Sequence, residues 1–377
     1  NFAHLSSAFA EENRGFTLMT RSPTAVILRP HENGIRSIVT EKVDSGDNIL
    51  SLLGQSLEKA LTLDKKEFQR LLKGAPYPLV CDELDGYAHT LAGKILIRSQ
   101  LDCFDPRLPR KTFDLKTRAT LPIRMDIPNY KDHLHYKLET MHGLFGSYER
   151  EFYDMCRSAL LKYNFQVRLG NMDGIFVAYH NTAEIFGFQY LSREVLDEFL
   201  FGNAATGNAT FSIIAKLYDD LLERIVPLYP EDSILRLTFT ISRTGSKMTV
   251  FVEEIPEPEG KSLVPDASHF RQFTLSTYST VNGGRVDNVK LNPLGGDTWK
   301  LIYSLAETKP SLAEFLSARS KAAASARGAD DASICRSGND GFFRGINVST
   351  VSPKPHMSTS QTPIIADWTV VPPHQNT

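Results

Sequence analysis

The sequence predicts a mixed α/β protein in which helices flank a sheet and the second half of the chain is rich in strands. Apolar residues recur at three- and four-residue steps in some segments and alternate in others, a mixture typical of helices and half-buried strands in one chain. The chain has 377 residues, of which 41% are hydrophobic and 23% charged, so it is long enough to bury a sizeable core.

Changes in this pattern divide the chain into four parts. We expect an entry segment at 1–40, a core of helices and strands at 41–230, and a β-rich part that packs on this core at 231–318. Residues 319–377 are rich in Ala, Ser, Gly and Pro and show little periodicity. Such a composition does not favour a packed core, so we expect most of this tail to be disordered.

The core begins with an amphipathic helix, which an apolar stripe predicts over 48–63 with Ser45 or Asp47 as its N-cap. The period then changes, and 89–104 and 112–122 are expected to form two strands joined by a proline-containing turn. The other expected elements are helices at 65–73, 146–163, from 192 and at 208–225, strands at 165–169, 174–180, 185–191, 270–281 and 298–305, and a hairpin of 235–241 and 248–252 across 244–246.

Net charge and cysteine content exclude some classes of function. Lys and Arg total 42 and Asp and Glu total 44, so the chain has a net charge of -2 and is not a polybasic binder. Its four cysteines form no CxxC pair, which favours a reducing compartment without structural zinc. No stretch approaches the roughly 18 apolar residues of a membrane-spanning helix. The first residue is Asn1, so we expect the natural N-terminus to lie upstream.

One pair of expected strands carries side chains suited to catalysis. Asp114 and Lys116 are two residues apart on a strand, so they share one face. Asp102 lies on the preceding strand, and a hairpin would bring it to the same edge of the sheet. Two carboxylates at one place repel each other unless a cation lies between them. The pattern therefore predicts a metal site, with surface ion pairing of Asp114 and Lys116 as the ordinary alternative.

Such a group suits metal-dependent hydrolysis of phosphodiesters. Asp102 and Asp114 would hold Mg²⁺ or Mn²⁺, hard cations that prefer oxygen ligands, and the backbone carbonyl of Leu115 is a further expected ligand. Lys116 would orient the attacking water or stabilise charge that develops on phosphorus. Glu58 lies off the apolar stripe of its helix, so it is either a third ligand or water-positioning group, or a solvated surface residue.

The order of a helix with an acid, a strand with Asp and a strand with Asp-x-Lys resembles the PD-(D/E)XK nuclease superfamily, especially its RecB-like branch. The resemblance implies a restriction-endonuclease-like core. The spacing of Gly54 and Glu58 resembles the helix motif of that branch, which often has His where Glu58 stands. Asp102, Asp114 and Lys116 take the places of the strand Asp and of the Asp and Lys of the triplet.

The literal Pro-Asp pair of the superfamily is absent, because Asp105 and Pro106 stand in the reverse order. Asp105 therefore remains an alternative to Asp102 as the metal ligand.

Longer segments resemble a fungal mitochondrial RNA-processing family of the Pet type, and the resemblance spans roughly residues 20 to 310. The segments that carry it are 53–61 (LGQSLEKAL), 100–109 (QLDCFDPRLP), 113–119 (FDLKTRA), 148–163 (YEREFYDMCRSALLKY), 166–182 (QVRLGNMDGIFVAYHNT) and 185–191 (IFGFQYL). The resemblance implies a 5′-directed RNA exonuclease or processing factor. It also implies peripheral attachment to the matrix side of the mitochondrial inner membrane, with mitochondrial transcripts and the mitochondrial RNA polymerase or degradation machinery as partners.

Basic residues surround the expected site. Residues 98–124 contain seven Lys or Arg and three Asp, which suits contact with a nucleic-acid backbone, although a solvated turn has the same composition. Tyr153 would contact the substrate or pack in the core. The expected RNA-binding residues are Arg107, Arg118, Arg124, Tyr153, Gln166 and Arg168.

Two hypotheses of different kinds follow. One is a metal-dependent ribonuclease in which Glu58, Asp102, Asp114 and Lys116 act together. The other is a non-catalytic nuclease-like module that binds RNA and recruits or stimulates a separate exonuclease. A DNA repair nuclease is a third option, because the motifs do not distinguish sugars. The sequence leaves open the polarity, the exo- or endonuclease mode and the oligomeric state.

Overall fold

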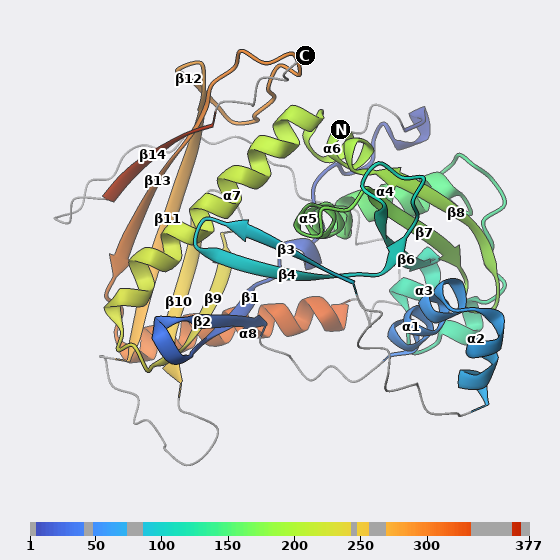
Figure 1. Ribbon diagram of the computed structural model, residues 1–377, viewed down its shortest axis with the longest axis horizontal. Coiled ribbons are helices and arrows are strands. Elements are labelled where there is room, and N and C mark those ends of the chain that lie inside the picture. Colours follow the sequence, from blue (N-terminus) through green and yellow to red (C-terminus); the bar gives the residue numbers. More distant parts are fainter. Residues whose placement is uncertain are drawn as a thin grey trace. The chain divides into compact units, whose positions relative to one another are not determined.

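The computed structural model describes residues 5–40, 48–73, 86–242, 247–255, 269–332 and 364–370. The chain forms two compact units, whose elements are labelled in Figure 1. The first unit lies within 1–20 and 45–219, and the second within 21–44 and 220–331 together with strand β14. The sequence predicted different boundaries, because it treated 1–40 as one segment.

The first unit contains helices and two small sheets. Its helices are α1 (Ile49–Thr62), α2 (Lys65–Leu72), α3 (Leu121–Met125), α4 (Tyr148–Ser158), α5 (Leu160–Leu169) and α6 (Arg193–Phe201), followed by α7 (Ala204–Ile225), which continues into the second unit. Its strands are β3 (Gly86–Ala92), β4 (Ile95–Leu101), β5 (Cys103–Phe104), β6 (Thr112–Ala119), β7 (Gly174–His180) and β8 (Ile185–Ser192).

The central sheet of the first unit has the strand order β5-β6-β7-β8. Strands β6 and β7 are parallel, with Asp114 opposite Ile175 and Lys116 opposite Val177, while β7 and β8 are antiparallel. A parallel pair needs a crossover connection, and α4 and α5 lie in the connection between β6 and β7. Side chains from these helices and strands bury a common core that includes Phe152, Met155 and Leu160.

Local sequence explains where these helices begin. The Asn48 side chain accepts hydrogen bonds from the backbone N–H groups of Leu50 and Ser51, so Asn48 is the N-cap of α1. Ser147 caps α4 by accepting from the backbone N–H of Arg150. The caps expected at Ser45 and Asp47 lie outside the described residues.

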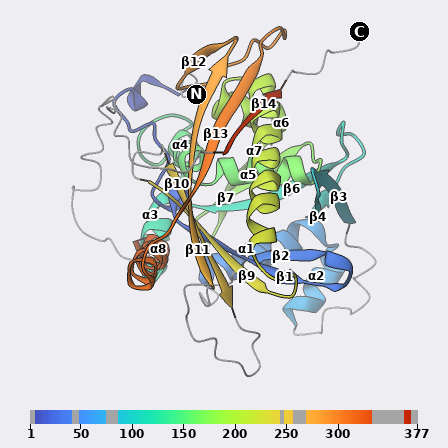
Figure 2. The same cartoon turned by 90° about the vertical axis from the view of Figure 1, so that its left-hand side faces the viewer.

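The second unit is built on an antiparallel sheet in the order β14-β13-β11-β10-β9-β1-β2, with β12 paired to β11. Its strands are β1 (Thr24–Pro30), β2 (Arg36–Thr40), β9 (Ile234–Ile241), β10 (Lys247–Ile255), β11 (Phe270–Val281), β12 (Gly284–Val286), β13 (Trp299–Thr308) and β14 (Ile364–Val370). Helix α8 (Leu312–Ala332) packs on this sheet through Phe315, which contacts Phe251 and Phe270. Figure 2 shows β9, β10, β11 and β13 side by side.

The predicted mixed architecture, with helices on a sheet and a strand-rich second half, is confirmed. Three local predictions differ. Residues 89–104 are not one strand but hairpin β3–β4 and the short β5, because Gly93 adopts a positive φ that lets the chain turn. Residues 165–169 are the last turns of α5, where packing of Val167 outweighs its strand propensity. The expected tail at 319–377 includes the end of α8, whose Ala-rich sequence favours a helix, and strand β14.

The expected hairpin turn at 244–246 lies outside the described residues, although β9 and β10 pair on either side of it.

We predict that Gly174→Ala destabilises the first unit. A Cβ at this position on β7 would lie 2.3 Å from the Leu191 backbone oxygen and 2.8 Å from the Ser192 Cα, so the β7–β8 pair must separate. Thermal unfolding of the full chain should show a loss of about 1–3 kcal/mol. Gly284→Ala, where the nearest atom would be 3.6 Å away, is the matched control and should leave stability nearly unchanged. Equal effects of the two substitutions would contradict this account.

Candidate active site

Helix α1 packs closely against strand β6. A Cβ at Gly54 would lie 3.2 Å from the Thr117 side-chain oxygen, so the small residue permits this approach. Glu58 follows Gly54 by four residues, which is about one helical turn, so the two share one side of α1. The Glu58 carboxylate consequently lies in the electrostatic range of Asp102 and Lys116.

Strands β5 and β6 bring two aspartates together. Cys103 on β5 pairs with Phe113 on β6 in antiparallel register, so Asp102 stands opposite Asp114. Asp114 is completely buried. The Lys116 ammonium, two residues along the same strand, lies 2.6 Å from the Asp114 Oδ2 atom.

Perturbed pKa values indicate how closely these groups interact. The pKa of Asp114 is raised to about 7, first by burial and then by the neighbouring Asp102 carboxyl, whereas Lys116 opposes the rise. Burial and Asp102 also raise the pKa of Glu58. The pKa of Cys103 is raised to about 12, by burial first and then by the charges of all three acids. Asp102, Asp114 and Lys116 therefore lie close together, with Glu58 in their electrostatic range.

The donor set fits a divalent cation. Both Asp114 carboxylate oxygens are buried, and neither has a hydrogen-bond partner of good geometry among the described residues. Most buried polar groups are hydrogen-bonded, so two facing carboxylates with only an ammonium nearby suit a further cation. Within the described ranges no three His, Cys, Asp or Glu side chains form a ready-made metal cluster. Mg²⁺ needs only one or two protein carboxylates, since water and substrate phosphate complete its shell.

Leu115 lies between Asp114 and Lys116 on β6, where it is opposite Phe176 of β7. Its backbone carbonyl belongs to the residue that directly follows Asp114, and its role as a ligand stays a prediction.

The structure distinguishes Asp102 from its rival, Asp105. The Asp105 carboxylate accepts hydrogen bonds from the backbone and the guanidinium of Arg107, which lower its pKa to about 2. Its backbone N–H donates to the Lys111 carbonyl across the turn. Asp105 therefore closes the β5–β6 turn, and Asp102 is the aspartate that lies beside Asp114.

Of the predicted RNA-binding residues, Arg107 is the most accessible. Its side chain is 88% exposed and lies in the turn that follows β5. Gln166 is half-buried on α5. Arg168 is buried, and its guanidinium binds Asp197 at 2.6 Å and Asn208 at 2.8 Å, so it holds α5 against α6 and α7.

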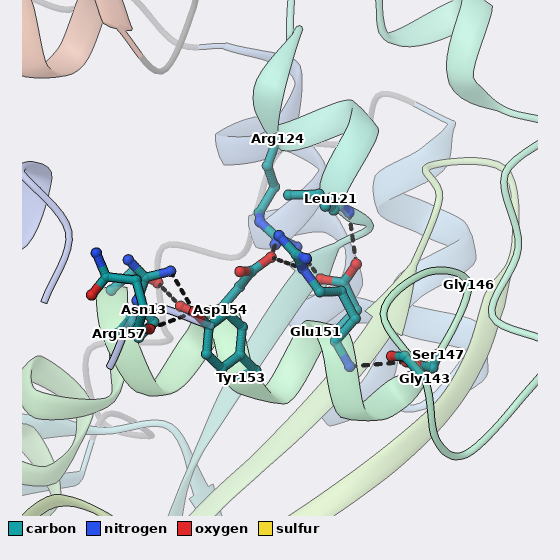
Figure 3. A network of polar contacts seen from close by, with 12 residues as sticks. Asn13, Leu121, Arg124, Gly143, Gly146, Ser147, Glu151, Tyr153, Asp154 and Arg157 are labelled. Atoms are coloured by element: carbon teal, nitrogen blue, oxygen red, sulfur yellow. Dashed lines mark hydrogen bonds and ion pairs between the residues drawn. The ribbon is translucent and has the colours of Figure 1, made fainter. Parts of the chain in front are cut away.

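Arg124 belongs to a polar network around α4 (Figure 3), and the buried Arg118 lies near the same glutamate, Glu151. Arg124 forms ion pairs with Glu151 and Asp154, and the Glu151 carboxylate also accepts a hydrogen bond from the Leu121 backbone N–H at 2.7 Å. The Arg118 Nε atom lies 3.5 Å from Glu151, and within the described part of the chain its Nε and Nη2 atoms have no hydrogen-bond partner. This network fixes α3 and α4 behind β6.

Tyr153 also lies in this region of Figure 3 and is only 1% exposed. Its ring packs on Phe9, and its hydroxyl donates to the Asn13 backbone oxygen and accepts from Arg157. These contacts favour core packing, the alternative that the sequence left open for this residue.

Two residues near the acids were missed as site candidates. The Tyr163 ring centre on α5 lies 5.3 Å from the Lys116 ammonium, in the range of a cation–π interaction. The sequence placed Tyr163 only in the apolar stripe, since its period matches that stripe. Cys103 directly follows Asp102, and this adjacency was the available signal for it.

The fold and the site define a mixed α+β protein with an acidic centre and a lysine on one strand of its central sheet. A family model described as "Mitochondrial protein Pet127" matches residues 1–223. The chain therefore belongs to the Pet127 family of mitochondrial proteins.

Two relatives with names are similar over much of the chain. The Schizosaccharomyces pombe protein named "mRNA degradation protein pet127, mitochondrial" is 35% identical over 287 residues, which cover 73% of this chain and 55% of the relative. The Saccharomyces cerevisiae protein named "Putative mitochondrial translation system component PET127" is 37% identical over 225 residues, 59% of this chain and 26% of the relative. The chain thus spans about half or less of the length of these relatives.

Among solved structures, Scheffersomyces stipitis Rai1 in complex with (3′-NADP)+ and calcium ion is similar with a TM-score of 0.31 and 11% identity. The match covers 59% of this chain and 62% of that one. A likeness of this size carries no argument about fold or function.

None of the helices in the described ranges combines the length and apolar character needed to cross a bilayer.

We predict a pH-dependent difference between the wild type and Asp114→Asn when divalent cations are removed. Because the folded-state pKa of Asp114 is about 7 and its ordinary value is 3.8, the folded protein binds this proton more tightly than the unfolded chain does. Wild-type stability should therefore fall as pH rises from about 4 to about 7, by at most about 1.4 kcal/mol per pH unit. The Asn variant cannot ionise at this position and should lack this decline.

Urea unfolding of both proteins in EDTA at several pH values measures the difference. A stability gap that stays constant between pH 4.5 and pH 7.5 would contradict the raised pKa.

Proposed function

We propose that this chain is a mitochondrial metal-dependent ribonuclease that acts from 5′ ends in RNA processing and degradation. The observation that carries the proposal is the buried carboxylate of Asp114, which lies beside the Asp102 carboxylate and has the Lys116 ammonium 2.6 Å away. One ammonium does not balance two neighbouring carboxylates, and burying the unbalanced charge is unfavourable, so the arrangement suits a further cation.

The order and placement of these residues support the PD-(D/E)XK type of nuclease. In that type an acid on a helix and acids on two neighbouring strands surround one centre, with a lysine on the second strand. Here Glu58 belongs to α1, Asp102 follows β4, and Asp114 and Lys116 belong to β6.

In this proposal each residue has one task in phosphodiester hydrolysis. Asp102 and Asp114, with the Leu115 carbonyl, would hold Mg²⁺ or Mn²⁺, which supplies Lewis-acid polarisation of the phosphoryl group and lowers the pKa of a bound water. The Lys116 ammonium would move from the Asp114 carboxylate towards the phosphoryl oxygens and stabilise the charge that develops there. Glu58, with its raised pKa, would orient the attacking water or accept its proton.

RNA is the favoured substrate because a relative is named for mitochondrial mRNA degradation. The 5′-to-3′ direction and the exonuclease mode rest on the resemblance to the Pet-type family. We also propose a location on the matrix side of the inner membrane, with peripheral attachment, and contacts with the mitochondrial RNA polymerase or the degradation machinery.

A non-catalytic RNA-binding module is the second candidate. It is favoured by one observation, namely that the described residues contain no ready-made cluster of three metal-ligating side chains. In that case the chain would bind RNA and recruit or stimulate another exonuclease.

We predict that Asp114→Ala, Asp102→Ala and Lys116→Met each reduce RNA degradation by at least about 100-fold, because each removes a group that acts on the reacting phosphate. The assay measures turnover of a 5′-monophosphorylated RNA by the full chain with Mg²⁺ or Mn²⁺, and EDTA should abolish turnover. Asp105→Ala is the matched control, since this aspartate binds Arg107 in the turn and should leave turnover largely unchanged. Wild-type turnover by folded Asp114→Ala would exclude the enzyme and favour the binding module.

We further predict that a circular RNA resists degradation while the linear RNA of the same sequence is degraded. An exonuclease requires a free end, whereas an endonuclease does not. A 5′-to-3′ exonuclease removes the 5′ nucleotide first. With a 5′-labelled linear substrate, the label should therefore appear in released nucleotides early in the reaction. Rapid cleavage of the circle would show an endonuclease, and late release of the 5′ label would show the opposite polarity.

A further inference from the structure

Hairpin β3–β4 presents an exposed face that is basic and aromatic. Side chains alternate along its strands, and one set is exposed while the other is half-buried. The exposed side chains form cross-strand pairs, which are Tyr87 with Gln100, His89 with Arg98, and Leu91 with Leu96. Residues 86–101 contain no Asp or Glu, so the face has no acidic side chain of its own to repel an anion.

Two of these side chains already form a stacked pair. The Arg98 guanidinium lies 4.7 Å from the centre of the Tyr87 ring, which is 41% exposed. A cation beside an exposed aromatic ring is a surface on which bases of single-stranded nucleic acids stack while the cation contacts phosphate.

The hairpin is held in place at both ends. Leu101 packs against the buried core of the first unit, and the Thr90 hydroxyl donates to the Leu169 backbone oxygen at 2.7 Å. At the turn, the Lys94 backbone N–H donates to the Asp219 carboxylate, and Gly93 leaves no room for a side chain against that carboxylate. A fixed surface loses little entropy when it binds a ligand.

The exposed face leads to the candidate active site. Arg98 and Gln100 lie on β4, which ends at Leu101, so they directly precede Asp102 along the chain. Asp102 follows Arg98 by four residues, so their Cα atoms are at most about 13 Å apart. Figure 1 shows the chain continuing from β4 of the hairpin towards β6.

We propose that this face binds the single-stranded part of an RNA substrate beside the active site. Tyr87 stacks on a base, Arg98 binds a backbone phosphate, and His89 and Gln100 contact the same strand. This inference rests on the proposed function, since it assigns the substrate surface of that site. RNA is favoured over a protein partner because the charged and aromatic pairs lie nearest Asp102, while the aliphatic pair lies at the far end of the hairpin.

The test measures the affinity of the full chain for an unstructured, fluorescent single-stranded RNA in EDTA, where hydrolysis does not interfere. Tyr87→Ala should weaken binding by about 5- to 100-fold, and Arg98→Ala should reduce the slope of log affinity against log salt by about one. Tyr278→Ala is the matched control, because Arg285 lies 5.1 Å from that exposed ring in the second unit, and it should bind RNA as the wild type does.

The outcomes separate this inference from the proposed function. Wild-type RNA affinity in folded Tyr87→Ala and Arg98→Ala would overturn it, even if the chain degrades RNA. Equal losses in Tyr278→Ala would also overturn it, since binding would then not be local to the hairpin. Unchanged RNA affinity together with an altered oligomeric state of Leu91→Ser would assign the face to a protein contact and overturn the RNA proposal. If Tyr87→Ala and Arg98→Ala lose RNA affinity while the wild type shows no nuclease activity, this inference is supported and the proposed enzyme is rejected.

Discussion

The buried carboxylate of Asp114 is the constraint on which the first unit is organised. It lies on a strand between a parallel neighbour and a short antiparallel one, and its closest charged neighbours are Lys116 and Asp102. Ionising it in this place is costly, which is why its pKa rises to about 7. An apolar residue of similar size would be better for stability, and the proposed metal site gives a reason for this buried acid.

The surrounding fold keeps this group in position rather than merely burying it. Helix α1 can approach β6 because Gly54 has no side chain, and that approach brings Glu58 near the aspartates. Behind β6, the Glu151 carboxylate binds Arg124 and the start of α3, which fixes the end of the strand. Hairpin β3–β4 directly precedes Asp102 and is anchored at its turn and at Leu101. These contacts fix the chain that leads to this aspartate.

Sequence reasoning could predict the site where local periodicity and spacing determine it. The two-residue step from Asp114 to Lys116 and the four-residue step from Gly54 to Glu58 need only strand and helix geometry. The choice of Asp102 over Asp105 required the register of β5 with β6, which depends on where the turn closes. Tyr163 was missed because an aromatic residue on an apolar stripe gives no sign of a lysine across the core. The buried ion pair of Arg168 with Asp197 likewise depends on how α5 and α6 pack, which the spacing of residues in the sequence does not show.

The most direct test of a cation between the two aspartates is anomalous diffraction from a crystal of the full chain soaked with Mn²⁺. One peak should appear at about 2.0–2.3 Å from carboxylate oxygens of both Asp102 and Asp114, with the Lys116 ammonium displaced from the Asp114 carboxylate. A crystal soaked with ample Mn²⁺ that shows no peak there, and in which Lys116 still binds Asp114, would contradict the account.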